Sequence, residues 1–240
     1  MSEIGMIYDR ARTWRNGRSV LARVIAHYEG AARPRLLDVG CGRGEVLSCA
    51  ERFGIPASGI EGHPEGLKEC REQGFDVAEM DLEDRQRFPW DEGSFGIVTF
   101  LKTLEHLSLE AGRAVLRECF RVLAPGGLLY LTSDSRHNRY YRAHPLHRHC
   151  YTRDELAAEL TRIGFSRLLP EYAPASFTEL FPYAWNVRLR RKLDLDPPAP
   201  GRVVVVPERL NSYASFVVRG FYHFVKLKRL EGGVHVFAFK

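Results

Sequence analysis

The sequence lacks any uninterrupted apolar run of about 18 residues, which is the length that a membrane-spanning helix needs. It also lacks an apolar leader, because the opening stretch MSEIGMIYDRARTWRNGRSV is charged where a secretory signal peptide would be hydrophobic. These two absences predict a cytoplasmic protein with no membrane-spanning segment.

Cysteine is scarce and shows no paired spacing. The 240 residues include five cysteines, an odd number, and no two of them form a Cys-x-x-Cys pattern. This indicates neither a disulfide framework nor a zinc site, so we expect reduced thiols. The five are Cys41, Cys49, Cys70, Cys119 and Cys150.

An excess of one sign of charge is confined to a single segment. The chain carries a net charge of +5, yet residues 174–230 alone hold ten basic residues against four acidic ones. The rest of the chain is nearly neutral, which argues against a DNA-binding protein with a basic surface throughout. We therefore expect a local basic surface and no DNA partner.

The remaining composition is that of one globular domain. With 45% hydrophobic and 27% charged residues, a chain of this length can bury a sizeable core. Strand-like and helix-like stretches alternate from residue 35 to about residue 169, which is typical of a parallel sheet covered by helices. We expect a single domain over residues 1–240, with an N-terminal helical cap over 1–30 and a helical insert over 174–230. The strands are expected near Leu36–Val39, Ser58–Glu61, Val77–Met80, Phe95–Phe100, Leu128–Ser133, Phe165–Leu169 and Val234–Lys240.

The best-marked helix follows Thr152. The stretch TRDE places its hydroxyl three residues before Glu155, which is the pattern of a capping box. An apolar stripe runs through the following residues, and Gly164 is expected to end the helix.

A glycine-rich stretch, LLDVGCGRGEVL, joins the first expected strand to a helix. Glycines at alternate positions let a ligand touch the backbone at the carboxyl end of a parallel sheet. The third glycine, Gly44, comes too early for the Gly-x-Gly-x-x-Gly pattern of dinucleotide folds, and Glu45 would repel a pyrophosphate. Because Asp38 also precedes the loop, a cationic or zwitterionic ligand suits this site better.

These residues resemble the first motif of the class I S-adenosylmethionine-dependent methyltransferases, and further motifs follow in the order of that family. Glu61 ends the second expected strand, where relatives hold the ribose hydroxyls, and EMDLED resembles the segment that holds the adenine edge. GSFGIVTFLKTLEHL and RVLAPGGLLYLTSDS resemble the fourth and fifth strands. The resemblance covers residues 33–170 and points to a small-molecule branch that includes the ubiquinone-pathway O-methyltransferases.

The resemblance implies an α/β fold, namely a Rossmann-like, seven-stranded, mostly parallel sheet with helices on both faces. The last strand is expected to be antiparallel, with a helical insert between strands six and seven. S-adenosylmethionine is the implied cofactor, and the implied activity is methyl transfer to a small or lipid-linked acceptor, with a hydroxyl favoured. A non-catalytic cofactor-binding module, an N-methyltransferase and an RNA ribose methyltransferase are the alternatives. The residues expected around the cofactor are Asp38, Gly40, Cys41, Gly42, Gly44, Glu61, Gly62, Asp81, Leu82 and Leu101.

Two positions depart from the family pattern. Gly96 stands where relatives often have an aspartate in the fourth strand, so a local strand contact is expected to be missing. Some relatives bind a divalent ion through a Glu-x-x-Glu-His pattern, but here Lys102 replaces the first acid before Glu105 and His106. Because an ammonium group at that position opposes a metal ion, we expect no metal.

A hydroxyl acceptor must lose a proton, and histidine is the natural recipient near neutral pH. His106 follows the fourth expected strand and is the first candidate for the general base. His144, His147 and His149 crowd into AHPLHRHCYT, a loop expected to overhang the same pocket. His147 and His149 are the reserve candidates for the base. A helix-capping role for His106, solvated loop histidines, and metal binding by the loop with Cys150 are the alternatives.

The basic segment has two interpretations. Its second half is expected to form a helix from Pro207, with an apolar stripe through Leu210, Val217 and Phe224. The insert either packs back on the sheet as part of the acceptor site or lies on an anionic lipid surface, which the basic run RLRRK suits. In the second case, residues 178–229 make a peripheral membrane contact.

Overall fold

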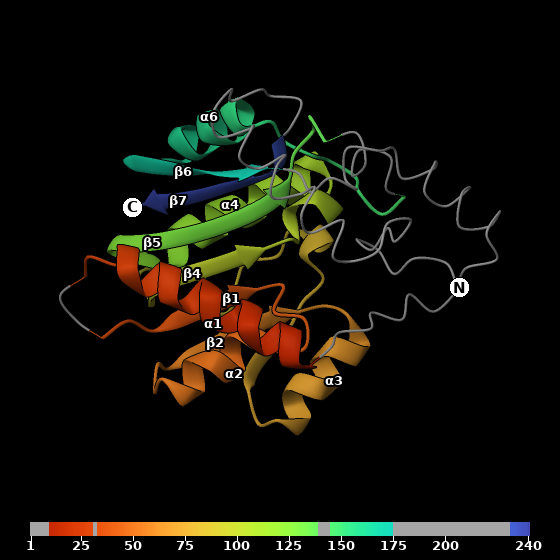
Figure 1. The fold of residues 1–240 in the computed structure, drawn as a ribbon, viewed down its shortest axis with the longest axis vertical. Helices are drawn as coiled ribbons and strands as arrows, with labels where there is room; N and C mark the ends of the chain where they lie inside the picture. The colour runs from red at the N-terminus through yellow and green to blue at the C-terminus, as the bar shows by residue number, and fades with distance from the viewer. Residues whose placement is uncertain (1–9, 31–32, 139–144, 175–230) are drawn as a thin grey trace, which may run out of the picture.

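The computed structural model describes residues 10–30, 33–138, 145–174 and 231–240. These residues form a mostly parallel sheet with helices on both faces (Figure 1). The expected insert over 174–230, including the helix from Pro207, lies outside the described residues apart from its first position. The first nine residues of the expected N-terminal cap lie outside them as well.

Seven strands form the sheet. In chain order they are β1 (Leu36–Val39), β2 (Ala57–Glu61), β3 (Asp76–Glu79), β4 (Phe95–Leu101), β5 (Leu123–Asp134), β6 (Arg167–Pro174) and β7 (Glu231–Phe239). Their order across the sheet is β3-β2-β1-β4-β5-β7-β6. The first five pair in parallel, whereas β7 is antiparallel to both β5 and β6. The expected seven-stranded sheet with an antiparallel last strand is confirmed.

β5 and β6 extend furthest beyond the bounds that the sequence predicted. β6 continues through Pro170 to Pro174, past its expected end at Leu169. It can do so because it is the last strand of the described sheet, and edge strands tolerate a residue that lacks an N–H. β5 begins early, at Leu123, because this residue pairs with Phe95 before the register shifts at a bulge.

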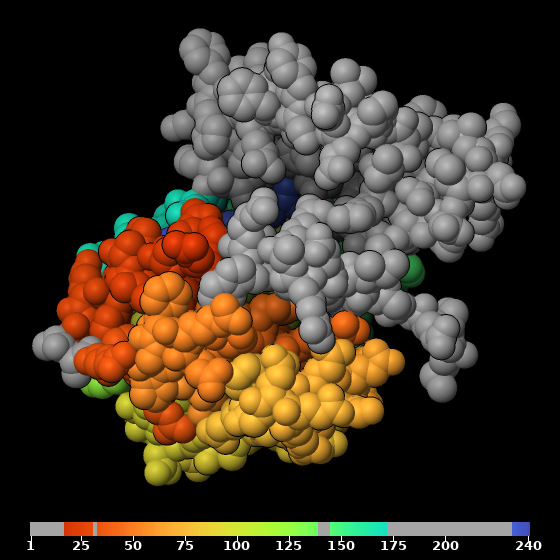
Figure 2. Space-filling model, turned by 60° about the horizontal axis from the view of Figure 1, so that its bottom comes forward, coloured from red at the N-terminus to blue at the C-terminus, as the bar shows by residue number. Residues whose placement is uncertain are grey.

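Helices connect the strands and cover both faces of the sheet. They are α1 (Arg10–His27), α2 (Glu45–Arg52), α3 (Pro64–Glu72), α4 (Leu109–Val122) and α6 (Arg153–Ile163), with the short 3-10 helices η1 (Leu82–Asp84) and η2 (Leu104–His106). Ile97 of β4 belongs to a buried cluster with α1 and α2, whereas its neighbour Val98 belongs to one with α4 and α6. The expected helices on both faces are therefore confirmed, and Figure 2 shows α1, α2 and α3 side by side over one side of the molecule. None of the described helices combines the length and the hydropathy that crossing a bilayer requires.

The helix α6 begins and ends where the sequence predicted. The Thr152 hydroxyl accepts the N–H of Glu155 at 3.2 Å, and the Glu155 carboxylate accepts the N–H of Thr152 at 2.8 Å. The capping box is therefore complete. Gly164 ends the helix with a φ angle of 125°, which glycine adopts without strain.

Packing explains the glycine that replaces an aspartate in β4. A Cβ at Gly96 would lie 2.7 Å from the hydroxyl oxygen of Tyr28 and 3.1 Å from the Cβ of Pro34. Tyr28 follows α1, and its N–H donates to the Ile25 carbonyl oxygen at 3.2 Å. The tyrosine therefore takes the space beside the glycine and links the end of α1 to the sheet.

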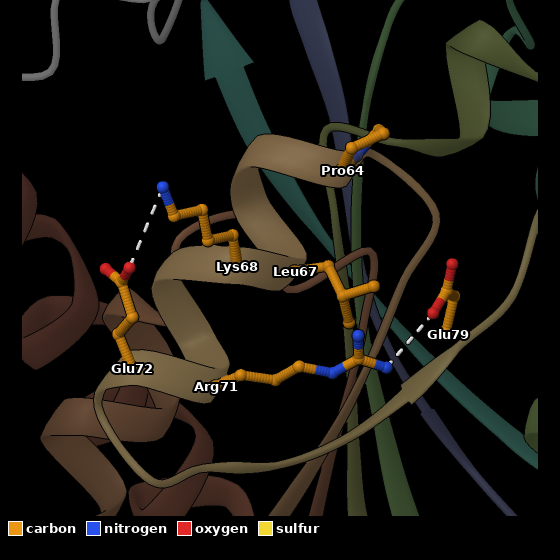
Figure 3. Close-up of a pocket in the computed structure, with 6 residues that line it drawn as sticks. All are labelled: Pro64, Leu67, Lys68, Arg71, Glu72 and Glu79. Atoms are coloured by element: carbon orange, nitrogen blue, oxygen red, sulfur yellow. Dashed lines mark hydrogen bonds and ion pairs between the residues drawn. The ribbon is translucent and has the colours of Figure 1, made fainter.

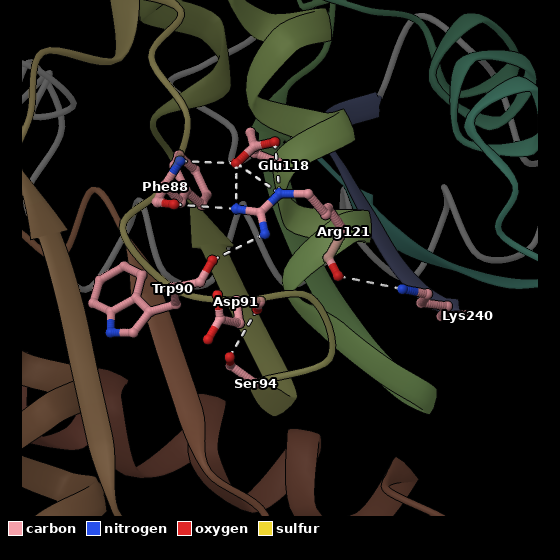
Figure 4. Close-up of polar contacts among 7 residues, drawn as sticks. All are labelled: Phe88, Trp90, Asp91, Ser94, Glu118, Arg121 and Lys240. Carbon is pink, nitrogen blue, oxygen red and sulfur yellow. Dashed lines mark hydrogen bonds and ion pairs between the residues drawn. The ribbon is translucent and has the colours of Figure 1, made fainter.

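A polar network ties the segment before β4 to α4 (Figure 4). The Arg121 guanidinium donates to the carbonyl oxygens of Trp90 at 2.9 Å and Phe88 at 3.1 Å. It also donates to the Glu118 carboxylate at 2.7 Å, and this carboxylate accepts the N–H of Phe88 at 2.8 Å. Burial alone would raise the pKa of Glu118, but these hydrogen bonds bring the pKa below its ordinary value. The network holds residues 85–94, which connect η1 to β4.

We predict that Glu118→Ala lowers the free energy of unfolding by about 2 to 3 kcal/mol, because a mostly buried guanidinium and the Phe88 N–H lose their acceptor. The folded-state pKa of Glu118 is depressed, so its contribution is present above the unfolded-state pKa and is lost as the pH falls through the folded-state value. Urea unfolding at about pH 7 and about pH 3 measures both effects.

The control for this measurement is Glu72→Ala on α3. Its carboxylate is 63% exposed and lies 3.8 Å from Lys68, so its loss should change stability by less than about 0.5 kcal/mol. An equal loss of stability in the two variants would contradict the prediction.

Candidate functional site

The glycine-rich loop follows β1, at the point where the order of the strands across the sheet reverses between β1 and β4. β1 pairs with β2 on one side and with β4 on the other, and all three strands end at the same edge. The carboxyl ends of parallel strands at such a point form the crevice in which open α/β sheets bind ligands. Three of the expected cofactor residues, Asp38, Glu61 and Leu101, lie at these strand ends.

The loop glycines have backbone conformations that favour glycine, with φ angles of 70° at Gly40, 57° at Gly42 and 82° at Gly44. A Cβ at Gly40 would lie 2.5 Å from Thr103 Oγ1, and one at Gly44 would lie 2.8 Å from the Phe75 ring. Within the described structure, no atom lies within 4 Å of the Cβ position at Gly42. The outer two glycines therefore let the loop pack against its neighbours, whereas Gly42 presents bare backbone to open space.

Two backbone N–H groups hold the Glu61 carboxylate in place. The N–H of Gly42 donates to one oxygen and the N–H of His63 to the other, each at an N···O distance of 2.7 Å. A carboxylate accepts about four hydrogen bonds, so both oxygens keep capacity for a further donor. The Glu61 carboxylate is thus fixed in orientation and can accept further donors. Gly62, also expected near the cofactor, has a packing role, since a Cβ there would lie 2.7 Å from the Met80 carbonyl oxygen.

Asp38 is buried beneath the loop and has other acids near it. The residue is 3% exposed and accepts a hydrogen bond from the Thr99 hydroxyl at 2.7 Å. Burial raises the pKa of Asp38 to about 7 against the lowering effect of Thr99, and the charges of Glu45 and Glu61 raise it further. Burial also raises the pKa of Glu45. An acidic group of this kind favours a ligand that brings positive charge.

The other expected cofactor residues contribute in different ways. Asp81 is exposed at the same edge and caps η1 by accepting the N–H of Glu83 at 2.9 Å. Leu82 is buried in the core. The sulfur of Cys41 lies 4.0 Å from that of Cys70, so its side chain points into the packing beneath α3. Fewer side chains are therefore available to a ligand here than the sequence predicted.

A second group of polar side chains lies just beyond the end of β4. Glu105, His106 and His147 each place one possible ligand atom within 4.8 Å of the others, and the two imidazole rings meet edge to face at 5.0 Å. Glu105 is 1% exposed, and its Oε2 has no hydrogen-bond partner among the described residues. Burial raises the pKa of Glu105, and the charge of Lys102 opposes that rise. Two of the expected histidines therefore meet around Glu105, which the sequence did not place among the expected site residues.

Hydrogen bonds and an ion pair seat the histidine loop on the end of β4. The carbonyl oxygen of Glu105 accepts the N–H of Arg148 at 2.9 Å, and the Arg148 guanidinium lies 3.0 Å from the Glu83 carboxylate of η1. Nδ1 of His106 hydrogen-bonds the Leu146 carbonyl oxygen at 3.1 Å. Because a carbonyl oxygen only accepts, the neutral ring of His106 carries its proton on Nδ1 and leaves Nε2 as the acceptor.

The expected loop histidines have different surroundings. The side chain of His147 is 6% exposed, with Nε2 at 3.6 Å from Asp134 and Nδ1 at 3.8 Å from the sulfur of Cys150. His149, a reserve candidate for the base, packs edge to face on a neighbouring tyrosine with ring centroids 4.5 Å apart. Burial lowers the pKa of His149. His144 lies outside the described residues.

Asp134 is a candidate functional residue that sequence reasoning missed, and Glu105 was considered only as part of a divalent-ion pattern. Asp134 is the last residue of β5, so its position at the carboxyl end of a central strand was a usable signal. Glu105 directly precedes the candidate base, but nothing in the sequence indicated its burial. Lys102, which we expected to oppose a metal, forms an ion pair with Asp134.

A groove elsewhere on the molecule does not belong to this site. It encloses about 490 Å³ between α3 and β3 (Figure 3). Its charges are paired, Lys68 with Glu72 at 3.8 Å and Arg71 with Glu79 at 3.0 Å. The described residues that line the groove are Pro64, Leu67, Lys68, Arg71, Glu72 and Glu79. None of them is an expected site residue, so we assign the groove no function.

Comparison with known proteins agrees with this geometry. Residues 37–131 match the family described as a methyltransferase domain. The chain is 31% identical over 121 residues to the ubiquinone biosynthesis O-methyltransferase of Psychrobacter arcticus, and 34% identical over 110 residues to that of Xanthomonas oryzae pv. oryzae. These matches cover 47% and 44% of this chain and 45% of each relative, so they span about half the length of the relatives.

The fold also has a counterpart among solved structures. A SAM-dependent methyltransferase from Archaeoglobus fulgidus superposes with a TM-score of 0.62, covering 95% of this chain and 94% of that one. At 20% sequence identity, this likeness shows a shared fold. The domain match and the fold agree with the motifs that follow one another from the glycine loop to β5. Residues 37–131 are therefore similar to the methyltransferase domain family, within a fold shared with a SAM-dependent methyltransferase.

Proposed function

We propose that the chain binds S-adenosylmethionine at the glycine loop and transfers its methyl group to a hydroxyl of a small or lipid-linked acceptor. The observation behind this proposal is the Glu61 carboxylate, which two N–H groups hold beside the open backbone of Gly42. The relatives named ubiquinone biosynthesis O-methyltransferase support a hydroxyl as the acceptor group.

The loop fits this cofactor in charge and in shape. S-adenosylmethionine supplies a methyl group on a positively charged sulfur, and its amino-acid end carries an ammonium group. Asp38 and Glu61 give the loop the negative charge that suits such a ligand. Gly42 admits the amino-acid end against the backbone, Glu61 accepts the ribose hydroxyls, and Asp81 lies on the adenine side.

His106 is the residue best placed to take the proton of a hydroxyl acceptor. It follows β4 at the same edge as the glycine loop, and Nε2 is the acceptor nitrogen of its neutral ring. In the proposed reaction, Nε2 of His106 would take the proton of the acceptor hydroxyl. The acceptor oxygen would then bond to the methyl carbon with its own electron pair, and the pair of the broken carbon–sulfur bond would remain on the sulfur. His147 packs against His106 and has Asp134 beside it, so it is better placed to orient the base than to replace it.

The acceptor side of the proposal also draws on the basic segment. Residues 178–229 lie outside the described residues, but their sequence holds ten basic residues against four acidic ones. Basic runs of this kind attract anionic lipid surfaces, which supports a lipid-linked acceptor and a peripheral membrane contact.

Cofactor binding should depend on Glu61. We predict that Glu61→Ala weakens the affinity for S-adenosylmethionine about 10- to 100-fold, or about 1 to 3 kcal/mol, because the ribose hydroxyls lose a charged acceptor. Calorimetric titration measures this affinity. The matched control is Glu65→Ala, which removes an exposed carboxylate from the first turn of α3 and should bind as the wild type does. Unchanged affinity in a folded Glu61→Ala variant would remove this residue from the site.

Cofactor binding should also be linked to the proton of Asp38. Its folded-state pKa is raised from 3.8 to about 7, so the ligand-free protein holds an extra proton between these values. The contribution of protonated Asp38 to the free energy of unfolding is fully present below the unfolded-state pKa, and it is lost as the pH rises through about 7. A cationic ligand favours the ionised carboxylate, so we predict that affinity rises by up to about tenfold per pH unit until about pH 7.

Calorimetric titration at about pH 6, in two buffers of different ionisation enthalpy, measures the proton released on binding. Asp38→Asn should abolish both this release and the pH dependence. Asp154→Asn, which neutralises a 70% exposed carboxylate on α6, should leave both unchanged. Proton release that persists in Asp38→Asn would show that another group is responsible.

Turnover should depend on His106. We predict that His106→Ala lowers it about a hundredfold or more, with little effect on cofactor affinity, because a general base is lost. The assay follows a labelled methyl group from the cofactor to a series of phenols and catechols. His149→Ala changes the same loop outside the cluster and should be mild. Full activity in His106→Ala and His147→Ala alike would move the acceptor from oxygen to nitrogen, since a neutral amine attacks without a base.

A further inference from the structure

Lys102 follows β4 in a backbone conformation that lysine rarely adopts. Its φ angle is 52°, in the left-handed region. Its N–H donates to the Thr132 carbonyl oxygen of β5 at 2.8 Å, which holds the turn in place. Strained backbone of this kind persists where the surrounding structure enforces it, and it is concentrated at functional sites.

The ammonium group of Lys102 is directed across β5 toward β7. It forms an ion pair with Asp134, whose side chain is 5% exposed. A Cβ at Gly233 would lie 3.5 Å from both Lys102 Nζ and His235 Nε2. Burial, and then the charge of Lys102, lower the pKa of His235 to about 4, so this histidine is neutral near pH 7. Of these two side chains, the lysine therefore carries the positive charge.

The acids near this ammonium are buried, and one is incompletely paired. Glu105 Oε2 has no hydrogen-bond partner among the described residues, and the charge of Lys102 stabilises this carboxylate. His147 Nε2 lies 3.6 Å from Asp134 and so connects the two acids. Buried carboxylates destabilise one another unless a cation compensates them.

The same side chains form a partial ligand set for a divalent ion. Glu105, His106 and His147 offer one oxygen and two nitrogens within 4.8 Å, which are ligand types of manganese, iron and zinc sites. The ammonium of Lys102 opposes such an ion, because two positive charges near the same carboxylates repel each other. With the lysine in place, these residues fit a divalent ion poorly.

We propose that the Lys102 ammonium is the resident cation of this cluster and excludes a divalent ion from it. Asp134 holds the ammonium, while the lysine side chain is 50% exposed, so its charge is accessible from the solvent side of the site. One consequence rests on the proposed function: the Lys102 ammonium stabilises negative charge on the acceptor oxygen while His106 takes the proton.

The test measures manganese binding to the full chain through the loss of the free-ion electron paramagnetic resonance signal. Lys102→Glu should bind a single equivalent at least about tenfold more tightly than the wild type, because a ligand replaces a repelling charge. Lys102→Met removes only the charge and should gain less. Lys102→Arg keeps the charge and should behave as the wild type. Lys68→Glu makes the same charge change on the exposed face of α3 and should gain nothing.

Adding His106→Ala to Lys102→Glu should abolish the gain, which places the ion in the cluster. Wild-type binding as tight as that of Lys102→Glu would overturn the inference, because the lysine would then exclude nothing. No gain in Lys102→Glu and Lys102→Met, with thermal melting showing at least one of them folded, would overturn it as well.

These binding measurements need no acceptor, so they decide the inference even if the proposed methyl transfer fails. Where methyl transfer is detected, the wild type should keep its turnover in EDTA, and Lys102→Glu should require added manganese. Wild-type turnover that EDTA abolishes and manganese restores would also overturn the inference.

Discussion

The parallel pairing of β1 with β2 and β4 is the constraint on which the rest of the structure depends. Its register sets Val39 beside Ile60 on one side and Phe100 on the other, so the three strands end together. The glycine loop therefore emerges between Glu61 and the turn at Lys102. The buried clusters on the two faces of the sheet both support this edge, because neighbouring residues of β4 are buried on opposite faces. Segments far apart in sequence thus meet at one edge of the sheet without any direct link between them.

Clustered acidic side chains are the main electrostatic difficulty at this edge of the sheet, and the protein resolves it differently at each position. Glu61 receives two backbone N–H groups, which fix its orientation and leave acceptor capacity for a ligand. Burial raises the pKa of Asp38 to about 7, so this carboxyl holds a proton below that pH. Asp134 has the ammonium of Lys102. Two of these arrangements have direct consequences, which are a fixed orientation for the Glu61 carboxylate and a positive charge beside Asp134.

One carboxylate connects η1 to the start of α4 and to the histidine loop. Glu83 of η1 accepts the N–H of Ser108 at 2.6 Å and its hydroxyl at 2.9 Å, and it lies 3.0 Å from the Arg148 guanidinium. It thereby joins the segment after Asp81, the start of α4 and the histidine loop. Because the loop is also held by the carbonyl oxygen of Glu105, its position relative to β4 is set from two directions.

The sequence by itself determined the elements that depend on neighbouring residues. The glycine loop, the capping box at Thr152 and the alternation of strands and helices were predictable because each reflects local backbone geometry and side-chain periodicity. The passage of β6 through Pro170 was not, since it follows from a place at the sheet edge. Only the tertiary structure decided which polar side chains meet, bringing His147 to His106 while His149 packs on a tyrosine. The reason is physical, since such contacts depend on the three-dimensional path of a loop seated by distant backbone groups, which neither spacing nor composition encodes.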